Sequence, residues 1–232
     1  MTDFFRFPST PHLAWLGGGD IPRDDKLLSP ADVAELLSGE VVVEEKLDGA
    51  NLGISLALDG TLRAQNRGQY LASAHAGQFA RLPSWLAQHG DPLNAVLTPS
   101  LILFGEWCAA RHSLDYSALP DWFLLFDVYD RDAGRFWSAR RRDALARETG
   151  LFTVPHVAQG RTTLAEVKRI VMSTSSHYRA SQPFEGVVVR RESSDWCEAR
   201  AKVVRPDFNQ SIDTHWRRRA IEWNRVNYSA SR

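Results

Sequence analysis

The sequence predicts an α+β fold in which antiparallel β-sheets are flanked by helices. Segments rich in β-branched and aromatic residues outnumber the helical segments, and the two kinds do not alternate as they would in a doubly wound parallel fold. Two of the strand-like segments are joined by Asp59-Gly60, which is typical of an antiparallel hairpin turn. In a chain of 232 residues, of which 44% are hydrophobic, these elements can bury a sizeable core.

Capping residues mark the expected helices. Three of them begin after a Ser or Thr N-cap and two of these end at a glycine, residue types that satisfy the unpaired backbone groups of helix ends. The expected helices are 30–38, 139–149 and about 163–172, with a further one at 76–89 and a basic amphipathic one at 212–227.

Seven strands are expected between these helices, because short segments dominated by Val, Ile, Leu and aromatic residues are bounded by turn residues. They are 41–46, 52–58, 61–65, 101–107, 123–130, 186–191 and 199–205. No repeat, low-complexity segment or long linker interrupts this order, so we expect one compact unit.

The total charge gives no argument for a general affinity for polyanions. The 28 basic side chains match the 28 acidic ones, but residues 1–110 carry 7 basic and 13 acidic residues, whereas residues 111–232 carry 21 and 15. The second half could therefore face nucleic acid.

Cys108 and Cys197 lie far apart without metal-type spacing, which argues against a zinc site or a disulfide framework. Neither a signal peptide nor a membrane span is evident, and we expect a cytoplasmic protein.

Lysine is rare in this chain. Only four of the 28 basic residues are lysines, at positions 26, 46, 168 and 202. An amine, unlike a guanidinium, can lose its proton, so a lysine in an arginine-rich chain indicates a position that needs an amine.

The segment EEKLDGANLGI at 44–54 gathers polar groups around one such amine. Lys46 ends a hydrophobic strand and is followed by Asp48, Gly49 and Asn51. The competing interpretation is an ordinary surface hairpin, since a Lys-x-Asp-Gly string alone is only moderately specific.

Further charged residues interrupt later apolar strands. Glu106 follows LILFG, Glu185 precedes GVVV, and Lys202 lies within ARAKVV. Buried charges are costly unless they are paired or functional, so we expect these side chains and Lys46 to line one polar cleft. The alternative is that each of them alternates outward into solvent.

Six segments in order resemble the motifs of the covalent nucleotidyltransferase superfamily, which contains polynucleotide ligases and messenger-RNA capping enzymes. Within it, the Asn five residues after the lysine, the FGE triplet and the compact length resemble the RNA ligases. The segments are KLDG at 46–49, NRG at 66–68, FGEW at 104–107, FLLFDVYD at 123–130, FEGVVVR at 184–190 and RAKVVR at 200–205.

The resemblance implies an ATP-dependent RNA ligase with a ligase-type adenylyltransferase fold. Lys46 would attack the α-phosphate of ATP, and Lys202 and Arg200 would grip that phosphate. Asp48 would help hold the phosphate and metal, and Glu185 would bind Mg²⁺ or Mn²⁺. A neutral Lys46 costs roughly 4–5 kcal/mol at pH 7, so we expect Lys202, Arg200 and a bound Mg²⁺ to lower its pKa.

The same resemblance assigns the nucleotide-binding residues. Glu45 would lie beside the adenine through its backbone, and Asn51 would help hold the phosphates and metal. Arg67 would contact the ribose or a phosphate, and Glu106 would accept a hydrogen bond from a ribose hydroxyl. Phe123 would stack on adenine.

Two positions depart from the family's pattern or leave an alternative open. The last motif has Arg200 where RNA ligases commonly show a lysine, which keeps the positive charge but replaces an ammonium by a broader guanidinium. Phe126, of opposite strand parity to Phe123, is expected in the core, although the two could be exchanged.

Residues 1–206 would form the nucleotidyltransferase domain with an N-terminal extension, and 207–232 a short basic helical extension without an OB-fold. The expected partner is RNA with 5′-phosphate and 3′-hydroxyl ends, in RNA repair, with an end-healing kinase or phosphatase or a separate nucleic-acid-binding protein as a further partner. The alternatives are a minimal DNA ligase, a capping guanylyltransferase and a non-catalytic RNA-binding module.

Overall fold

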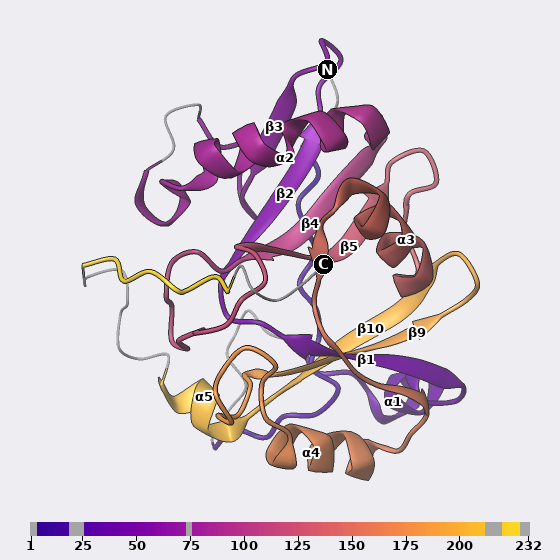
Figure 1. Cartoon of the computed structure of the whole chain (residues 1–232). Coiled ribbons are helices and arrows are strands. Elements are labelled where there is room, and N and C mark those ends of the chain that lie inside the picture. Colours follow the sequence, from indigo (N-terminus) through magenta and orange to yellow (C-terminus); the bar gives the residue numbers. More distant parts are fainter. Residues whose placement is uncertain (1–3, 19–25, 73–75, 212–219, 228–232) are drawn as a thin grey trace.

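Two antiparallel sheets stacked one above the other form the body of the protein (Figure 1). The computed structural model describes residues 4–18, 26–72, 76–211 and 220–227. One sheet has four strands in the order β10-β9-β1-β8. The other has six strands, in the order β3-β2-β4-β5-β6, with β7 pairing in parallel with β5. The predicted α+β class is confirmed.

The four-stranded sheet is covered by two helices. Its strands are β1 (Glu40–Lys46), β8 (His156–Arg161), β9 (Gly186–Glu192) and β10 (Cys197–Val204). The helices are α1 (Pro30–Leu36) and α4 (Leu164–Ser173), below the sheet in Figure 1. Valines of β1 and β9 pack against Leu36 of α1 and Val167 and Val171 of α4 in one apolar cluster.

The six-stranded sheet is covered on one face by α2 and α3. Its elements are β2 (Ala50–Leu56), β3 (Leu62–Gln65), β4 (Leu101–Trp107), β5 (Phe123–Asp130), β6 (Arg135–Phe136), β7 (Phe152–Thr153), α2 (Leu82–Val96), α3 (Ala139–Thr149) and a 3₁₀ turn at Gly77–Phe79. Trp85 and Leu93 of α2 and Leu145 of α3 pack on β2, β4 and β5, and this is the larger of the two main cores.

A β-bulge shapes the middle of the six-stranded sheet. The register between β4 and β5 shifts between Phe104 and Gly105, so that Phe104 pairs with Asp127 but Gly105 pairs with Leu125. Phe126 is left as the extra residue. A bulge sends two successive side chains to the same face of a sheet, so Phe126 and Asp127 both leave the helix-covered side.

Most of the predicted elements are confirmed to within a few residues, and two helices need correction. The helix expected at 76–89 is a short 3₁₀ turn followed by α2, which runs from Leu82 through Pro92 to Val96. Burial of Trp85, His89 and Leu93 on one face outweighs the poor helix propensity of Gly90 and Pro92.

The helix expected at 212–227 is wrong for its described part. Residues 220–227 form no helix, and Trp223 and Val226 make isolated bridges to Ala110 and Leu119 instead. Residues 212–219 lie outside the described residues. A short helix, α5 (Pro206–Ser211), precedes them.

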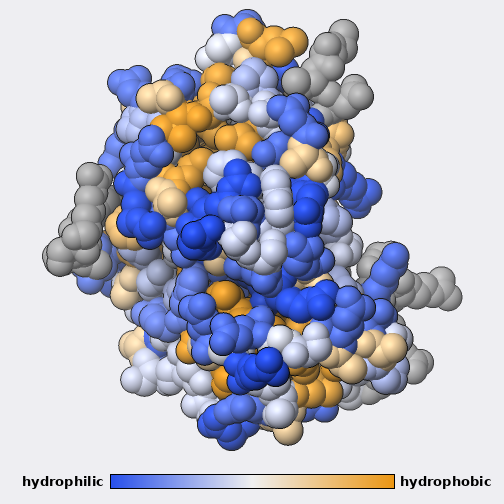
Figure 2. All heavy atoms as spheres, turned by 90° about the vertical axis from the view of Figure 1, so that its right-hand side faces the viewer, coloured by the Kyte–Doolittle hydropathy of each residue, from blue (hydrophilic) through white to orange (hydrophobic). Residues whose placement is uncertain are grey.

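The visible surface mixes polar and apolar areas. On the face in Figure 2, hydrophilic residues form a band across the middle of the molecule, with apolar areas above and below it. Within the described part of the chain, no helix is long and apolar enough to cross a membrane.

Candidate active site

A cleft of about 910 Å³ lies between the two sheets. This volume suits a ligand of nucleotide size. The cleft is lined by the ends of β1 and β2, by β10, by the turn after β3 and by the N-terminal segment 6–10. Among the residues expected at the site, the lining includes Glu45, Lys46, Asn51, Arg67, Glu106, Arg200 and Lys202. Most of the expected site residues thus come together.

Lys46 occupies the end of β1, where the strand leaves the sheet. Its Nζ lies 2.6 Å from Oε1 of Glu185, which precedes β9. The Lys46 side chain is 28% exposed, whereas that of Glu185 is 5% exposed. The register brings them together, since Lys46 pairs with Gly186 across β1 and β9. Glu185 does not line the cleft itself and lies behind the lysine.

The carboxylates around Lys46 favour its ammonium form. Burial lowers the pKa of Lys46, but Glu185, Glu106 and Asp48 outweigh it, and the net effect is a raised pKa. The expectation that Arg200 and Lys202 lower this pKa is therefore wrong for the chain without ligands. Three carboxylates around one amine favour the charged form.

The surrounding carboxylates are themselves perturbed. Burial, partly offset by Lys46, raises the pKa of Glu106 to about 8, and the nearby charges of Glu185 and Asp48 add to the rise. Burial likewise raises the pKa of Glu185 to about 7, against the opposing effect of Lys46. Both acids therefore titrate close to neutral pH, a property typical of functional sites.

Two oxygen atoms at this site have no hydrogen-bond partner among the described residues. They are the buried Oε2 of Glu185 and Oδ1 of Asn51. Asn51 pairs with Glu106 across β2 and β4, so the strand register sets both beside the cleft. Unpaired buried oxygens are costly, and a hard divalent cation takes such ligands. No preformed cluster of three His, Cys, Asp or Glu side chains suited to a metal exists in the described ranges.

The expected phosphate-binding residues differ in how they are held. Lys202 lines the cleft from β10, and its backbone pairs with the N-terminal segment, donating to Pro11 O and accepting from Leu13 N, both at 2.8 Å. Arg67 donates to Ser9 Oγ at 2.6 Å and to Phe7 O at 3.4 Å. The N-terminal segment thus forms a wall of the cleft, a role that no motif in its sequence indicates.

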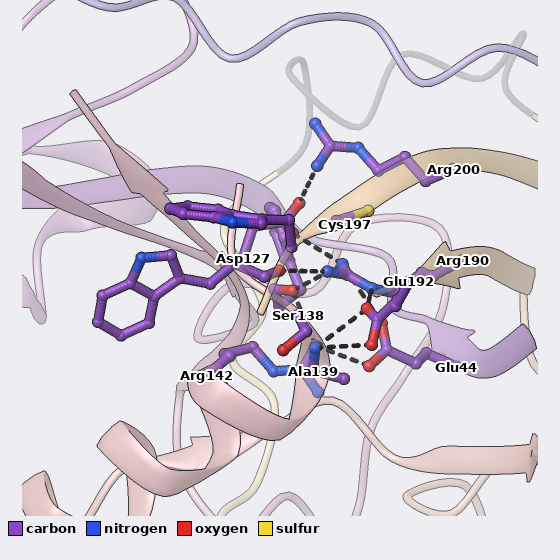
Figure 3. Close-up of polar contacts among 12 residues, drawn as sticks. Glu44, Asp127, Ser138, Ala139, Arg142, Arg190, Glu192, Cys197 and Arg200 are labelled. Atoms are coloured by element: carbon purple, nitrogen blue, oxygen red, sulfur yellow. Dashed lines mark hydrogen bonds and ion pairs between the residues drawn. The ribbon is translucent and has the colours of Figure 1, made fainter. Parts of the chain in front are cut away.

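Arg200 is part of a buried ionic network (Figure 3). Its Nη1 lies 2.7 Å from Asp127 Oδ2, and the other Asp127 oxygen lies 2.7 Å from Arg190 Nη1. Arg200 also lies over the rings of Phe7 and Phe136, at 4.7 and 4.0 Å. Its guanidinium pairs with Asp127 and packs against the two aromatic rings. A planar guanidinium suits both contacts, which explains why an arginine fits where a lysine was expected.

The same network continues to α3 and β1. Arg142 of α3 pairs with Glu44 of β1 at 2.6 Å, and Arg142 is fully buried. Arg190 also pairs with Glu192 at 2.7 Å, and both Glu192 carboxylate oxygens accept from the N–H of Ala139 at the start of α3. These contacts join the two sheets behind the cleft.

The aromatic residue at the cleft is Phe126 rather than Phe123. Phe123 has no exposed surface and packs with Trp85 in the core under α2. Phe126 lines the cleft and meets Phe7 edge to face at 5.3 Å. The expectation for Phe123 thus needs correction. Phe123 was expected at the nucleotide and Phe126 in the core, whereas Phe123 lies in the core and Phe126 at the cleft.

Glu45 and Asp48 make contacts away from the cleft opening. The Glu45 carboxylate accepts from Ser176 Oγ at 2.5 Å and from the N–H of His177 at 3.0 Å. Asp48 Oδ2 accepts from the backbone N–H groups of Ser113 and Leu114, each at 2.7 Å. Both side chains tie the lysine segment to neighbouring loops.

Sequence reasoning missed Glu44, Asp127, Arg142 and Arg190. Each is a charged residue within an apolar strand or on a helix face, the same signal that found Glu106 and Glu185. That signal was present for Glu44, Asp127 and Arg190, whereas Arg142 sits in a run of arginines that resembles a solvated helix face.

Known proteins resemble the chain in family and fold. A model of the family "RNA ligase" matches residues 39–204. No curated protein matches the sequence. Among solved structures, an archaeal ATP-dependent RNA ligase is 22% identical to this chain, with a TM-score of 0.58. The match covers 86% of this chain and 48% of the archaeal chain.

Two further structures share the fold. A Naegleria gruberi RNA ligase with PPi is 17% identical with a TM-score of 0.59, covering 90% of this chain and 64% of its own. A protein from Aquifex aeolicus, provisionally named an ATP-dependent DNA ligase, is 19% identical with a TM-score of 0.55. This match covers 89% of the present chain and 51% of the Aquifex chain. This chain spans less than two thirds of each. Because the family match extends over more than half of its residues, the chain belongs to the RNA ligase family.

Proposed function

We propose that the chain is an ATP-dependent RNA ligase that forms a covalent lysyl-AMP on Lys46. The observation that carries the proposal is the position of Lys46, at the cleft, 2.6 Å from Glu185 and within the field of Glu106 and Asp48. The chain's membership of the RNA ligase family supports the same conclusion.

In the first step, Lys46 Nζ attacks the α-phosphorus of ATP. A nitrogen–phosphorus bond forms, the bond from the α-phosphorus to the oxygen bridging to the β-phosphate breaks, and pyrophosphate leaves. Nζ must first lose a proton. Glu185 Oε1 is in contact with it, and a carboxylate whose pKa is about 7 is suited to accept a proton near neutral pH.

In the later steps, a 5′-phosphate oxygen of RNA attacks the phosphorus of the lysyl-AMP. The nitrogen–phosphorus bond breaks, and the amine of Lys46 is regenerated. The RNA 3′-hydroxyl then attacks the activated 5′-phosphate and AMP leaves. Lys202, which lines the cleft from β10 of the same sheet, would stabilise the charge that develops on the transferred phosphate.

The residues present fit a divalent cation, Mg²⁺ or Mn²⁺, beside the phosphates. Glu185 Oε2 and Asn51 Oδ1 are the buried oxygens without a partner at this place, and they would hold it. A bound cation supplies positive charge that neutralises the phosphates and favours the neutral form of Lys46.

The remaining lining residues would hold the nucleotide. We assign Phe126 to the adenine, in place of Phe123, and keep Glu106 at the ribose and Arg67 at the ribose or a phosphate. Glu45 would contribute its backbone, since its carboxylate faces Ser176.

Residues 1–206 would form the nucleotidyltransferase domain. The substrate would be RNA with 5′-phosphate and 3′-hydroxyl ends, in a repair role, and an end-healing enzyme remains a proposed partner.

The test is covalent labelling of the purified chain with α-³²P-ATP and, in parallel, α-³²P-GTP in the presence of Mg²⁺. We expect acid-labile label from ATP alone in the wild type. None is expected in Lys46→Arg, which keeps the positive charge but lacks a nucleophilic amine. Label from GTP would favour a capping enzyme. Label retained in Lys46→Arg would disprove the assignment of the nucleophile, and no label in the folded wild type would favour a non-catalytic RNA-binding role.

Transfer to nucleic acid is tested next. Labelled protein is mixed with 5′-phosphorylated RNA or DNA strands of the same sequence, either single-stranded or nicked. We expect AMP to pass to RNA ends. Preferential transfer to DNA would favour the DNA ligase alternative.

A further inference from the structure

Residues 220–227, here called the C-terminal strap, lie along the loop that follows β4. This loop, residues 108–119, is here called the support loop. Trp223 bridges to Ala110 and Val226 to Leu119, so the strap extends the support loop as a strand-like partner (Figure 1). Neither segment belongs to a sheet, and backbone hydrogen bonds between them satisfy several of the polar groups of each.

Asn224 is the residue through which the strap holds the support loop. Its side chain is buried, with a residue exposure of 6%. Nδ2 donates to Cys108 O at 2.8 Å, Oδ1 accepts from Tyr116 N at 2.9 Å, and its backbone N donates to Ala109 O at 2.9 Å. One side chain thus fixes both the beginning and the end of the turn that runs from 108 to 116.

The support loop in turn holds Asp48. Ser113 N and Leu114 N each donate to Asp48 Oδ2 at 2.7 Å, and the Tyr116 hydroxyl accepts from Asp48 N at 2.8 Å. Tyr116 is itself buried, so its hydroxyl has a fixed position. Both the carboxylate and the backbone of Asp48 are set by this loop.

Asp48 lies two residues after Lys46, at the turn where the chain passes from β1 to β2. Gly49, the next residue, approaches the backbone carbonyl of Trp107 so closely that a Cβ there would lie 2.6 Å from it. On this side the lysine segment packs closely against β4, whereas the Asp48 carboxylate and backbone N–H are held by the support loop. A displaced support loop would release these contacts of Asp48, two residues from Lys46.

We propose that Asn224 is a positioning residue for Lys46, acting through the support loop and Asp48. It does not touch the nucleotide. The inference rests on the proposed function for its effect on chemistry, but the coupling from Asn224 to Asp48 stands on the contacts above. A misplacement of reacting groups by about 1 Å can cost on the order of a hundredfold in rate.

The test compares Asn224→Ala with Ile221→Ala in the full chain. Ile221 lies on the same strap and is 43% exposed. Labelling from α-³²P-ATP is followed over time at several ATP concentrations. For Asn224→Ala we expect a rate constant lower by about tenfold or more, with the half-saturating ATP concentration changed by less than about threefold. Ile221→Ala should match the wild type.

The rate constant and the labelled fraction separate positioning from a loss of folded protein. A displaced Asp48 should lower the rate constant of the folded chains. Partial unfolding would reduce only the fraction of chains labelled. A reduced labelled fraction with an unchanged rate constant would overturn the proposal.

Hydrogen exchange tests the coupling without any activity. In Asn224→Ala we expect faster exchange of the amides of Asp48, Ser113 and Leu114, while amides of β9 keep their protection. Unchanged exchange at Asp48 would overturn the inference even if the chain is active. If the wild type takes no label but Asn224→Ala exchanges as expected, the proposed function fails and the coupling holds.

If Asn224→Ala does not fold, Asn224→Ser replaces it. A serine is neutral, and its single hydroxyl cannot bridge Cys108 O and Tyr116 N as the amide does. We expect a rate constant below that of the wild type. A full wild-type rate constant would contradict the positioning role of Asn224.

Discussion

One bulged residue decides which side chains of β5 face the cleft. With strict alternation, Phe123, Leu125 and Asp127 would share a face of β5, opposite to Phe126. Phe123 and Leu125 do face the helices, but the extra residue at 126 breaks the pattern at the next step, so that Asp127 lies with Phe126 on the side of the other sheet. Alternation can be read from a single strand, but a bulge depends on the partner strand, and the sequence of β5 alone could not show it.

This placement predicts different effects for the two phenylalanines. Phe126→Ala removes the ring from the cleft, and we expect the half-saturating ATP concentration for labelling to rise by about 5–20-fold, the equivalent of roughly 1–2 kcal/mol of stacking. Phe126→Tyr should restore it. Phe123→Leu is the matched control: it should lower the free energy of unfolding by about 1–2 kcal/mol with little change in ATP dependence. The opposite assignment of effects would contradict the position of Phe126.

At the scale of elements, the buried ionic network is the connection between the sheets. Arg142 on α3 meets Glu44 on β1 at 2.6 Å, and neither side chain is more than 2% exposed. Removing one member of a buried pair leaves the other charge uncompensated, which is far more costly than never having had the pair. The network therefore makes the relative position of α3 and β1 sensitive to single substitutions.

We expect Arg142→Leu to lower the free energy of unfolding by roughly 3–5 kcal/mol, because the buried Glu44 keeps only longer contacts, to His156 at 3.6 Å and to Arg190 at 3.8 Å. Arg140→Leu, two residues earlier on the same helix, is the control. Arg140 pairs with Asp195 at 3.4 Å, but its side chain is 72% exposed, so its loss should cost no more than about 1 kcal/mol. Chemical denaturation measures both values. Equal effects would mean that the network does not hold the sheets together.

Elements defined by local chemistry could be predicted, and those defined by a distant partner could not. Ser138 and Gly150 cap α3 with an N-cap hydrogen bond and a left-handed C-cap, and the helix runs between them as expected. By contrast, β8 is half-exposed and becomes a strand through pairing with β1. The strap is similar: residues 220–227 have a helix-like sequence pattern but bind the support loop in an extended form.

At the scale of the whole molecule, the candidate site could be predicted as a set of residues but not as an arrangement of charge. Charged residues in apolar strands and the ordered motifs indicated Lys46, Glu106, Glu185 and Lys202. The direction of the Lys46 pKa, in contrast, depends on three carboxylates brought together from separate segments. Such a site works against the stability of the fold, because buried acids are kept from ionising freely.

The last prediction concerns this conflict between site and stability. Burial is the main cause that raises the pKa of Glu106 from 4.5 to about 8, so the folded chain binds this proton more tightly than the unfolded chain does. Its contribution to stability is complete below pH 4.5 and is lost as the pH rises towards 8. Lys46 does not change this window, because its pKa is raised above an ordinary value of 10.5.

We therefore expect Glu106→Gln to match the wild type at pH 5 and to exceed its free energy of unfolding by roughly 2–4 kcal/mol at pH 8. The amide can still accept a hydrogen bond from Gly49 but never ionises. Glu198→Gln is the control, since Glu198 lies on the surface beside Arg135 and its pKa is lowered, so its effect falls in acid. Denaturant unfolding between pH 5 and pH 8 gives, for each variant, the slope of the free energy of unfolding against pH. If Glu106→Gln keeps the wild-type slope, Glu106 is ionised in the folded chain throughout, and the electrostatic strain that we assign to the site does not exist.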